Sequence, residues 1–135
     1  MIELSTPAIR STILVVDDNL LNIEVIYEML TPSYEVLFAT SGLEALELTV
    51  ATNPDLILLD VMMPGLNGYE VCRHLKMDVV TQHIPIIFIT AAGQTDSEEK
   101  GLKLGAIDYI AKPFSPAVVK ARIANHLELK RYRDL

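Results

Sequence analysis

The sequence predicts an α/β fold in which helices cover both faces of a parallel β-sheet. Short apolar segments alternate along the chain with longer amphipathic ones, as expected of repeated strand–helix units. Three of the short segments, ILVV, LILL and IIFI, are apolar at every position, which is typical of strands buried on both faces. With half of its 135 residues hydrophobic, the chain is able to form one domain with its own core.

Five strands and five helices are expected, joined by short loops. Together with right-handed crossovers, this pattern predicts a flavodoxin-like, doubly wound (βα)5 sandwich with the strand order 2-1-3-4-5. The expected strands are Ile13–Val16, Tyr34–Ala39, Leu56–Leu59, Ile86–Ile89 and Ile107–Ile110.

Capping and stop residues mark the helices between these strands. Thr40 or Ser41 is the expected cap of a helix that ends at Asn53-Pro54 and has apolar residues at Leu43, Leu46 and Val50. The next helix, Leu66–Lys76, follows a Pro-Gly turn. The helix after it is expected to be capped by Thr95 or Asp96, to run to Leu104 and to stop at Gly105.

The last helix begins near Ser115 and steps along its core face through Val119, Ile123 and Leu127. Residues 129–135 continue it without a stop signal, either as a frayed terminus or as the start of a linker. We therefore expect an N-terminal extension over residues 1–10, a single domain over 11–128, and the end of the last helix over 129–135.

Composition excludes several classes of function. The net charge is −7, and an acidic domain is repelled by phosphate backbones, so we expect no direct nucleic-acid binding. No apolar run is long enough to span a membrane. The single cysteine, Cys72, excludes an internal disulfide and suits a reducing compartment. We expect a soluble, cytoplasmic protein.

Polar residues follow the expected strands at the edge of the sheet where a doubly wound fold places its site. Asp17 and Asp18 follow the first strand, Asp60 the third, Thr90 the fourth, and Lys112 lies just beyond the fifth. Three neighbouring carboxylates repel one another unless a cation compensates them, and oxygen ligands suit Mg²⁺. The alternative, that Asp18 or Asn19 only caps the first helix, leaves Asp60 unexplained.

The same residues are suited to phosphoryl transfer. A carboxylate such as Asp60 is able to attack phosphorus and form an acyl phosphate. The transition state spreads negative charge over the phosphoryl oxygens, and the Lys112 ammonium and a divalent cation would each neutralise part of it. Thr90 would donate its hydroxyl to a phosphoryl oxygen. Taken alone, a lysine such as Lys112 is usually solvated surface, and Thr90 is also consistent with strand packing.

The motifs ILVVDD, LILLDVMMPGLNGYEV, IPIIFITA and GAIDYIAKPF resemble the receiver domains of two-component response regulators, from about Ser11 to about Leu127. The resemblance implies that Asp60 is the phosphoacceptor and that Mg²⁺ or Mn²⁺ is the cofactor. It also implies that Asp18 binds the cation directly, Asp17 mainly through water, and Met62 through its backbone carbonyl. The Lys112–Pro113 bond is expected to be cis.

The resemblance further implies a conformational switch. Thr90 would move toward the phosphoryl group and Tyr109 would turn into the space that it leaves, changing the surface formed by the fourth helix, fifth strand and fifth helix. A homodimer could form through this surface, where Lys103, Asp108 and Arg122 lie; such charges are also common on solvated surfaces.

The phosphodonor would be a histidine kinase or a histidine phosphotransfer protein, and an output domain would follow Leu135. Such a chain is a signalling module that catalyses its own phosphorylation and slow dephosphorylation, not a turnover enzyme.

Three other classes fit less well. A flavodoxin-like electron carrier needs a neutral phosphate loop after the first strand, where this chain has Asp17 and Asp18. A dehalogenase-type phosphatase needs a second acid two residues after its nucleophile, where this chain has Met62. A P-loop nucleotidase needs a glycine-rich lysine motif that the sequence lacks. An interaction module without phosphoryl chemistry remains an alternative, but it would not explain why these polar residues converge.

Overall fold

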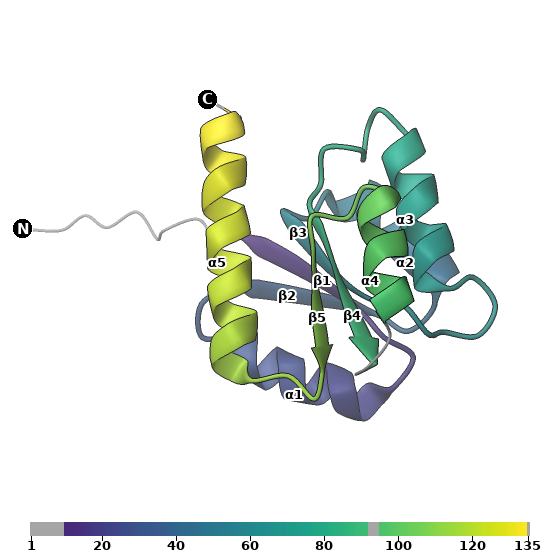
Figure 1. The fold of residues 1–135 in the computed structure, drawn as a ribbon. Coiled ribbons are helices and arrows are strands. Elements are labelled where there is room, and N and C mark those ends of the chain that lie inside the picture. Colours follow the sequence, from purple (N-terminus) through teal and green to yellow (C-terminus); the bar gives the residue numbers. More distant parts are fainter. Residues whose placement is uncertain (1–9, 92–94, 135) are drawn as a thin grey trace, which may run out of the picture.

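The protein is a three-layer α/β sandwich around a five-stranded parallel sheet of order β2-β1-β3-β4-β5, as the sequence predicts (Figure 1). The computed structural model describes residues 10–91 and 95–134. Strands and helices alternate along the chain: β1 Thr12–Val16, α1 Leu20–Leu30, β2 Glu35–Ala39, α2 Gly42–Thr52, β3 Leu56–Asp60, α3 Gly68–Met77, β4 Ile86–Ala91, α4 Thr95–Lys103, β5 Asp108–Lys112 and α5 Pro116–Arg133.

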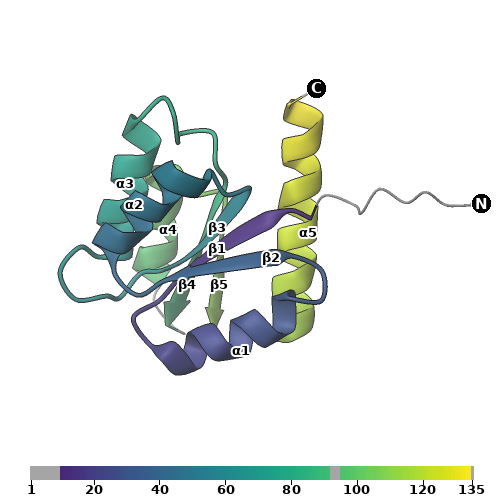
Figure 2. The same cartoon turned by 180° about the vertical axis from the view of Figure 1, so that it is seen from behind.

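Two apolar cores lie on opposite faces of the sheet. On one face, α1 and α5 pack against β1, β3 and β4, with Ile26 of α1 and Ile123 of α5 almost fully buried. On the other face, Val71 and Leu75 of α3 pack with Phe88 of β4 and with residues of α2. Figures 1 and 2 show α1 and α5 on one side of the sheet and α2, α3 and α4 on the other. The central strand β3 is buried along its whole length, which explains its uninterrupted apolar sequence.

Three strands extend beyond the predicted segments at their carboxyl ends. β3 includes Asp60, β4 runs through Thr90 to Ala91, and β5 includes Lys112, so that residue lies within its strand and not beyond it. Backbone pairing with neighbouring strands continues past the last apolar side chain, a feature that hydrophobicity does not report. Asp60, Thr90 and Lys112 are therefore positioned by the backbone pairing of the sheet.

Two helix starts differ from the prediction. α3 begins at Gly68, not Leu66, because Asn67 and Glu70 form a reciprocal capping box: the Asn67 side chain accepts from the Glu70 N–H, and the Glu70 carboxylate accepts from the Asn67 N–H. Thr95 and Asp96 lie inside α4, so neither is its cap; residue 94, which precedes the helix, lies outside the described residues.

Other predictions about the helices are confirmed. Ser41 caps α2, and Asn53 ends it in the left-handed conformation with φ 48°. Gly105 follows α4 with φ 106°, a conformation that favours glycine. Not all the apolar residues of α2 face the core, however. Leu43 and Val50 are exposed, and the helix packs through Gly42, Ala45 and Thr49.

The last helix continues well past the predicted domain boundary. α5 remains helical to Arg133, whose guanidinium donates to the His83 carbonyl oxygen at 2.9 Å, and Leu129 is exposed on its surface. The proposed extension over residues 1–10 lies outside the described residues except for Arg10, which donates to the carbonyl oxygens of Thr31 and Tyr34. Within residues 10–91 and 95–134, no helix is long and apolar enough to cross a membrane.

Candidate functional site

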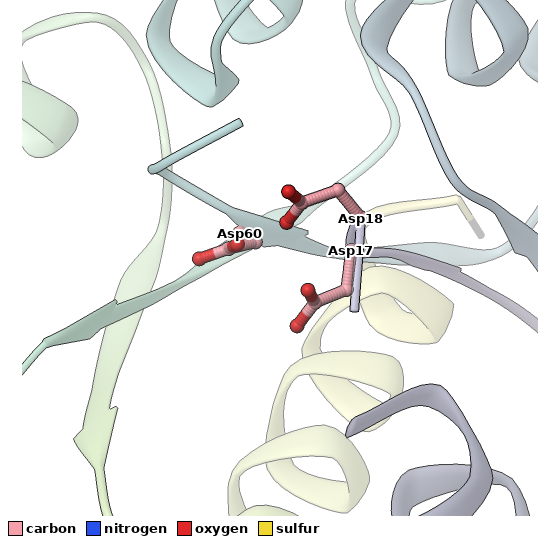
Figure 3. Close-up of side chains that lie close together, drawn as sticks. All are labelled: Asp17, Asp18 and Asp60. Atoms are coloured by element: carbon pink, nitrogen blue, oxygen red, sulfur yellow. The ribbon is translucent and has the colours of Figure 1, made fainter. Parts of the chain in front are cut away.

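Three carboxylates meet at the carboxyl edge of the sheet (Figure 3). Asp17 and Asp18 follow β1, and Asp60 is the last residue of β3, the neighbouring strand. One carboxylate oxygen from each residue lies within 4.8 Å of the others. Asp17 and Asp60 are only 2% and 5% exposed, whereas Asp18 is open to solvent. The structure therefore brings together the three acids that the sequence analysis selected.

The electrostatics of this cluster favour a bound cation. Burial, with a further contribution from the charge of Asp17, raises the pKa of Asp60 to about 6; Lys112 and the backbone N–H of Met62 act in the opposite direction. The raised pKa means that the protein alone does not fully compensate the charge of Asp60. A hard divalent cation with oxygen ligands would do so, and the three carboxylates fit such an ion.

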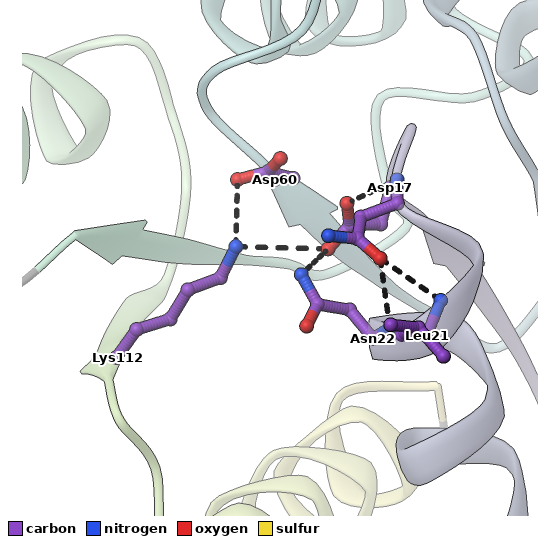
Figure 4. A network of polar contacts seen from close by, with 6 residues as sticks. Asp17, Leu21, Asn22, Asp60 and Lys112 are labelled. Atoms are coloured by element: carbon purple, nitrogen blue, oxygen red, sulfur yellow. Dashed lines mark hydrogen bonds and ion pairs between the residues drawn. The ribbon is translucent and has the colours of Figure 1, made fainter.

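Lys112 connects two of the carboxylates across the end of β4 (Figure 4). Its Nζ lies 3.5 Å from Oδ1 of Asp60 and 3.7 Å from Oδ2 of Asp17. The Lys112–Pro113 peptide bond is cis, as expected. The ammonium therefore reaches the proposed phosphoacceptor from a strand that is not adjacent to β3, which only a long and flexible side chain is able to do.

The loop between β1 and α1 and the first turn of α1 supply hydrogen bonds that orient Asp17. The Asn19 N–H donates to Oδ1 of Asp17 at 2.9 Å, and the Asn22 side-chain amide donates to Oδ2 at 3.1 Å. The Asn19 side chain caps α1 by accepting from the N–H groups of Leu21 and Asn22. Of the two caps considered from the sequence, Asn19 is therefore the one used, and Asp18 is left for the carboxylate cluster.

Asn22 is a site residue that the sequence analysis missed. It lies on the first turn of α1, so it is not among the polar residues that follow the expected strands. The available signal was its position five residues after Asp17 on the amino-terminal turn of a helix, which faces the same edge of the sheet.

Thr90 lies near the end of β4, next to β3, and is 1% exposed. Its Oγ1 has no hydrogen-bond partner among the residues that the structure describes. Leaving a buried hydroxyl without a partner costs about 1–3 kcal/mol. A side chain in this state is suited to donate to an oxygen that arrives during function.

Tyr109, the other member of the predicted switch pair, is half-buried on β5. It lies opposite Phe88 in the ladder between β4 and β5, and it packs against the same core as Phe88. Because side chains alternate along a strand, Thr90 and Phe88 project from the same face of β4. Thr90 and Tyr109 therefore share one face of the sheet, as a coupled pair requires.

The three charges of the predicted dimer face have partners within the chain. Arg122 of α5 donates to Oδ1 of Asp108 at 2.7 Å, and the His126 ring lies 3.0 Å from Oδ2. Burial acts to raise the pKa of Asp108, but hydrogen bonds from His126, the Tyr109 N–H and Arg122 lower it overall. Lys103 pairs with Glu99 on its own helix at 3.5 Å, and both side chains are exposed.

The doubly wound sheet and the acidic site at its carboxyl edge define the class of flavodoxin-like proteins that carry an aspartate cluster after β1 and β3. Within this class, the chain belongs to the response regulator receiver domain family, whose model matches residues 13–124. The matched range includes Asp17, Asp18, Asn22, Asp60, Thr90, Tyr109 and Lys112.

Curated relatives and solved structures agree with this assignment. The chain is 42% identical over 126 residues to a probable cyclic di-GMP phosphodiesterase of Vibrio cholerae, covering 93% of this chain and 29% of that protein. It is 47% identical over 116 residues to the phosphate regulon transcriptional regulatory protein PhoB of Pseudomonas aeruginosa, covering 85% and 51%. A putative response regulator from Chloroflexus aurantiacus superposes with a TM-score of 0.85 at 37% identity, covering 88% and 98%. The chain thus spans about half or less of the two curated relatives.

Proposed function

We propose that this receiver domain accepts a phosphoryl group on Asp60 from the phosphohistidine of a histidine kinase or histidine phosphotransfer protein. Asp17, Asp18, Asp60 and the backbone carbonyl of Met62 would hold Mg²⁺ or Mn²⁺. The observation that supports the proposal most strongly is the arrangement of three clustered carboxylates with Lys112 at 3.5 Å from Asp60. This combination suits an acyl-phosphate site, because the carboxylates attract a cation, and the cation and the Lys112 ammonium would neutralise the charge of the phosphoryl group.

The protein's own groups account for most of the transfer step. A carboxylate oxygen of Asp60 attacks phosphorus and forms the O–P bond, while the P–N bond of the donor breaks and the imidazole leaves with the electron pair and takes up a proton. With a pKa of about 6, Asp60 is mostly ionised at neutral pH and thus nucleophilic. Lys112 and Thr90 would neutralise charge on the phosphoryl oxygens, and a bound divalent cation would supply further charge stabilisation.

Phosphorylation would then change the face formed by α4, β5 and α5. The Thr90 hydroxyl would donate to a phosphoryl oxygen, and Tyr109 would move inward toward the space that Thr90 leaves. Both residues lie on one face of the sheet, next to α4, which supports this coupling. The altered face would contact a partner or a second copy of the chain.

The output would be carried by other parts of a longer protein or by separate partners. The response regulator PleD of Caulobacter vibrioides is 43% identical to this chain, which covers 27% of its length. This relative, PhoB and the Vibrio protein are all longer than the receiver domain. We propose that α5 and residues 129–135 lead into an output domain beyond Leu135, and that the protein acts in the cytoplasm as a signalling module.

Intact-mass spectrometry after incubation with acetyl phosphate tests the proposal. Wild type should gain one phosphoryl group with Mg²⁺ and none with EDTA, and Asp60→Asn should gain none. Asp134→Asn makes the same chemical change at the exposed end of α5 and should behave as wild type. An adduct of equal yield on Asp60→Asn would contradict the assignment of the phosphoacceptor.

A further inference from the structure

Asn22 holds the carboxylate of Asp17 from the first turn of α1 (Figure 4). Its Nδ2 donates to Oδ2 of Asp17 at 3.1 Å. Its own backbone N–H donates to the Asn19 side chain at 3.4 Å, so the residue is fixed through the cap of the helix as well. The side chain is half-buried, and its amide contacts the site through Asp17.

The Asp17 carboxylate is restrained at both oxygens. Oδ1 accepts from the Asn19 N–H at 2.9 Å, and Oδ2 accepts from Asn22 at 3.1 Å. The Lys112 ammonium is farther from the same Oδ2, at 3.7 Å. Two hydrogen bonds, one on each oxygen, fix both the direction and the rotation of a carboxylate that is 2% exposed. Asn22 is therefore the closest side-chain donor that the structure gives to Oδ2.

We infer that Asn22 is a positioning residue of the cation site: it fixes the Asp17 carboxylate for the cation and keeps the Lys112 ammonium shared between Asp17 and Asp60. This inference rests on the proposed function, since it assumes that Asp17 helps to hold a cation. Carboxylates at metal sites are themselves hydrogen-bonded, and loss of such a supporting partner weakens metal affinity about 10- to 100-fold.

Removal of the Asn22 amide would have two linked consequences. The Asp17 carboxylate would be free to rotate about its remaining bond to Asn19. Without the amide, the Lys112 ammonium would become the nearest side-chain donor to Oδ2 of Asp17. It would therefore move toward Asp17 and away from Asp60. Both changes weaken the site for a divalent cation, because a carboxylate paired closely with a lysine is a poorer ligand.

A structural role for Asn22 is distinguishable from this positioning role. α1 is capped by the Asn19 side chain, and the backbone N–H of residue 22 remains when its side chain is replaced. Asn22→Leu has the same branched shape and number of heavy atoms and keeps the helix, but it removes the donor. Asn22→Gln keeps a donor on a longer side chain, and Asn125→Leu makes the matched change at an exposed position on α5.

Isothermal titration of Mg²⁺ into these variants tests the inference, with thermal melting in EDTA to show that each is folded. We expect Asn22→Leu to bind Mg²⁺ at least about tenfold more weakly than wild type, Asn22→Gln to recover most of the affinity, and Asn125→Leu to match wild type. In an Asp17→Asn background, Asn22→Leu should have little further effect, because the carboxylate through which it acts is gone.

Three results would overturn the inference. Equal affinities of wild type and Asn22→Leu would overturn it alone and leave the proposed function standing. An equally large effect of Asn22→Leu in the Asp17→Asn background would show that Asn22 does not act through Asp17. No Mg²⁺ binding by wild type would overturn both the inference and the cation requirement of the proposed function.

Discussion

Lys112 bridges Asp60 and Asp17, with its Nζ 3.5 Å from the first carboxylate and 3.7 Å from the second. One ammonium therefore serves two buried carboxylates. Burial and the charge of Asp17 raise the pKa of Asp60 to about 6, although Lys112 acts to lower it. Phosphorylation of Asp60 would place new negative charge where this ammonium already lies. In the proposed reaction, Lys112 would therefore lie beside the newly added phosphoryl group.

Replacing Lys112 with methionine should slow phosphorylation by acetyl phosphate about 100-fold, because the phosphoryl oxygens lose a charged donor. Because Lys112 lowers the pKa of Asp60 in the wild type, this pKa should rise further in the variant. The pH profile of the phosphorylation rate should therefore shift to higher pH. Lys120→Met, an exposed change on α5, is the control. An unchanged rate and pH profile would exclude Lys112 from the reaction.

Asp60→Asn should stabilise the protein at neutral pH. The pKa of Asp60 is about 6 in the folded chain and 3.8 for an ordinary aspartate, so folding takes up a proton between these pH values. The stability contributed by this group is therefore greatest below pH about 4, declines as pH rises to about 6, and stays low above that. Removing the charge should raise the free energy of unfolding by about 2 kcal/mol at pH 7.

Urea denaturation at pH 4, 5, 6 and 7 measures this effect. The difference between Asp60→Asn and wild type should be small at pH 4 and should grow up to about pH 6, and Mg²⁺ should reduce it at pH 7 by stabilising wild type. A constant difference across this pH range would show that the charge of Asp60 is not the cause.

Thr90→Val should leave the unphosphorylated protein as stable as wild type or up to about 1 kcal/mol more stable. The substitution replaces a buried hydroxyl that has no partner among residues 10–91 and 95–134 with a methyl group of similar size. The variant should still be phosphorylated, but more slowly, and the change at Tyr109 should be lost. Urea denaturation and tyrosine fluorescence check these results; a loss of several kcal/mol would show that the hydroxyl already has a partner.

Asp108→Ala should lower the free energy of unfolding by about 1–3 kcal/mol, because Arg122 and His126 on α5 both lose their carboxylate partner on β5. The pKa of Asp108 is lowered by folding, so its stabilising effect is present above the unfolded pKa and is lost as pH falls through the lower folded value. Denaturation at pH 7 and pH 3 should show a smaller effect at the lower pH. Equal losses at both would indicate that packing, not the ion pair, is responsible.

The fold was largely predictable because its signals are local. Runs such as LILL identify a strand buried on both faces, and the polar residue after each run, such as Asp60, then falls at the site edge. The exposure of Leu43 and Val50 was not predictable in this way, since the face that α2 buries depends on its packing against α3. There a Cβ on Gly42 would lie only 2.6 Å from the Leu66 carbonyl oxygen.

The parts of the site that the sequence did not reveal depend on contacts between elements. Asn22 was missed because its role follows from the rotation of α1 about its axis, which brings the amide to Asp17. The engagement of Asp108 by His126 joins residues 18 apart on a strand and a helix, and no spacing rule connects them. Residues at strand ends are therefore easier to assign than those that support them from helices.

Localisation of the phosphoryl group tests the central claim most directly. An aspartyl phosphate is an acyl phosphate, and borohydride reduces it to an alcohol that marks the modified residue as homoserine. After phosphorylation with acetyl phosphate and Mg²⁺, followed by borohydride and peptide mass spectrometry, we predict homoserine at position 60 alone. Homoserine at position 17 or 18, or a phosphoryl adduct that survives borohydride on another side chain, would contradict the assignment of Asp60.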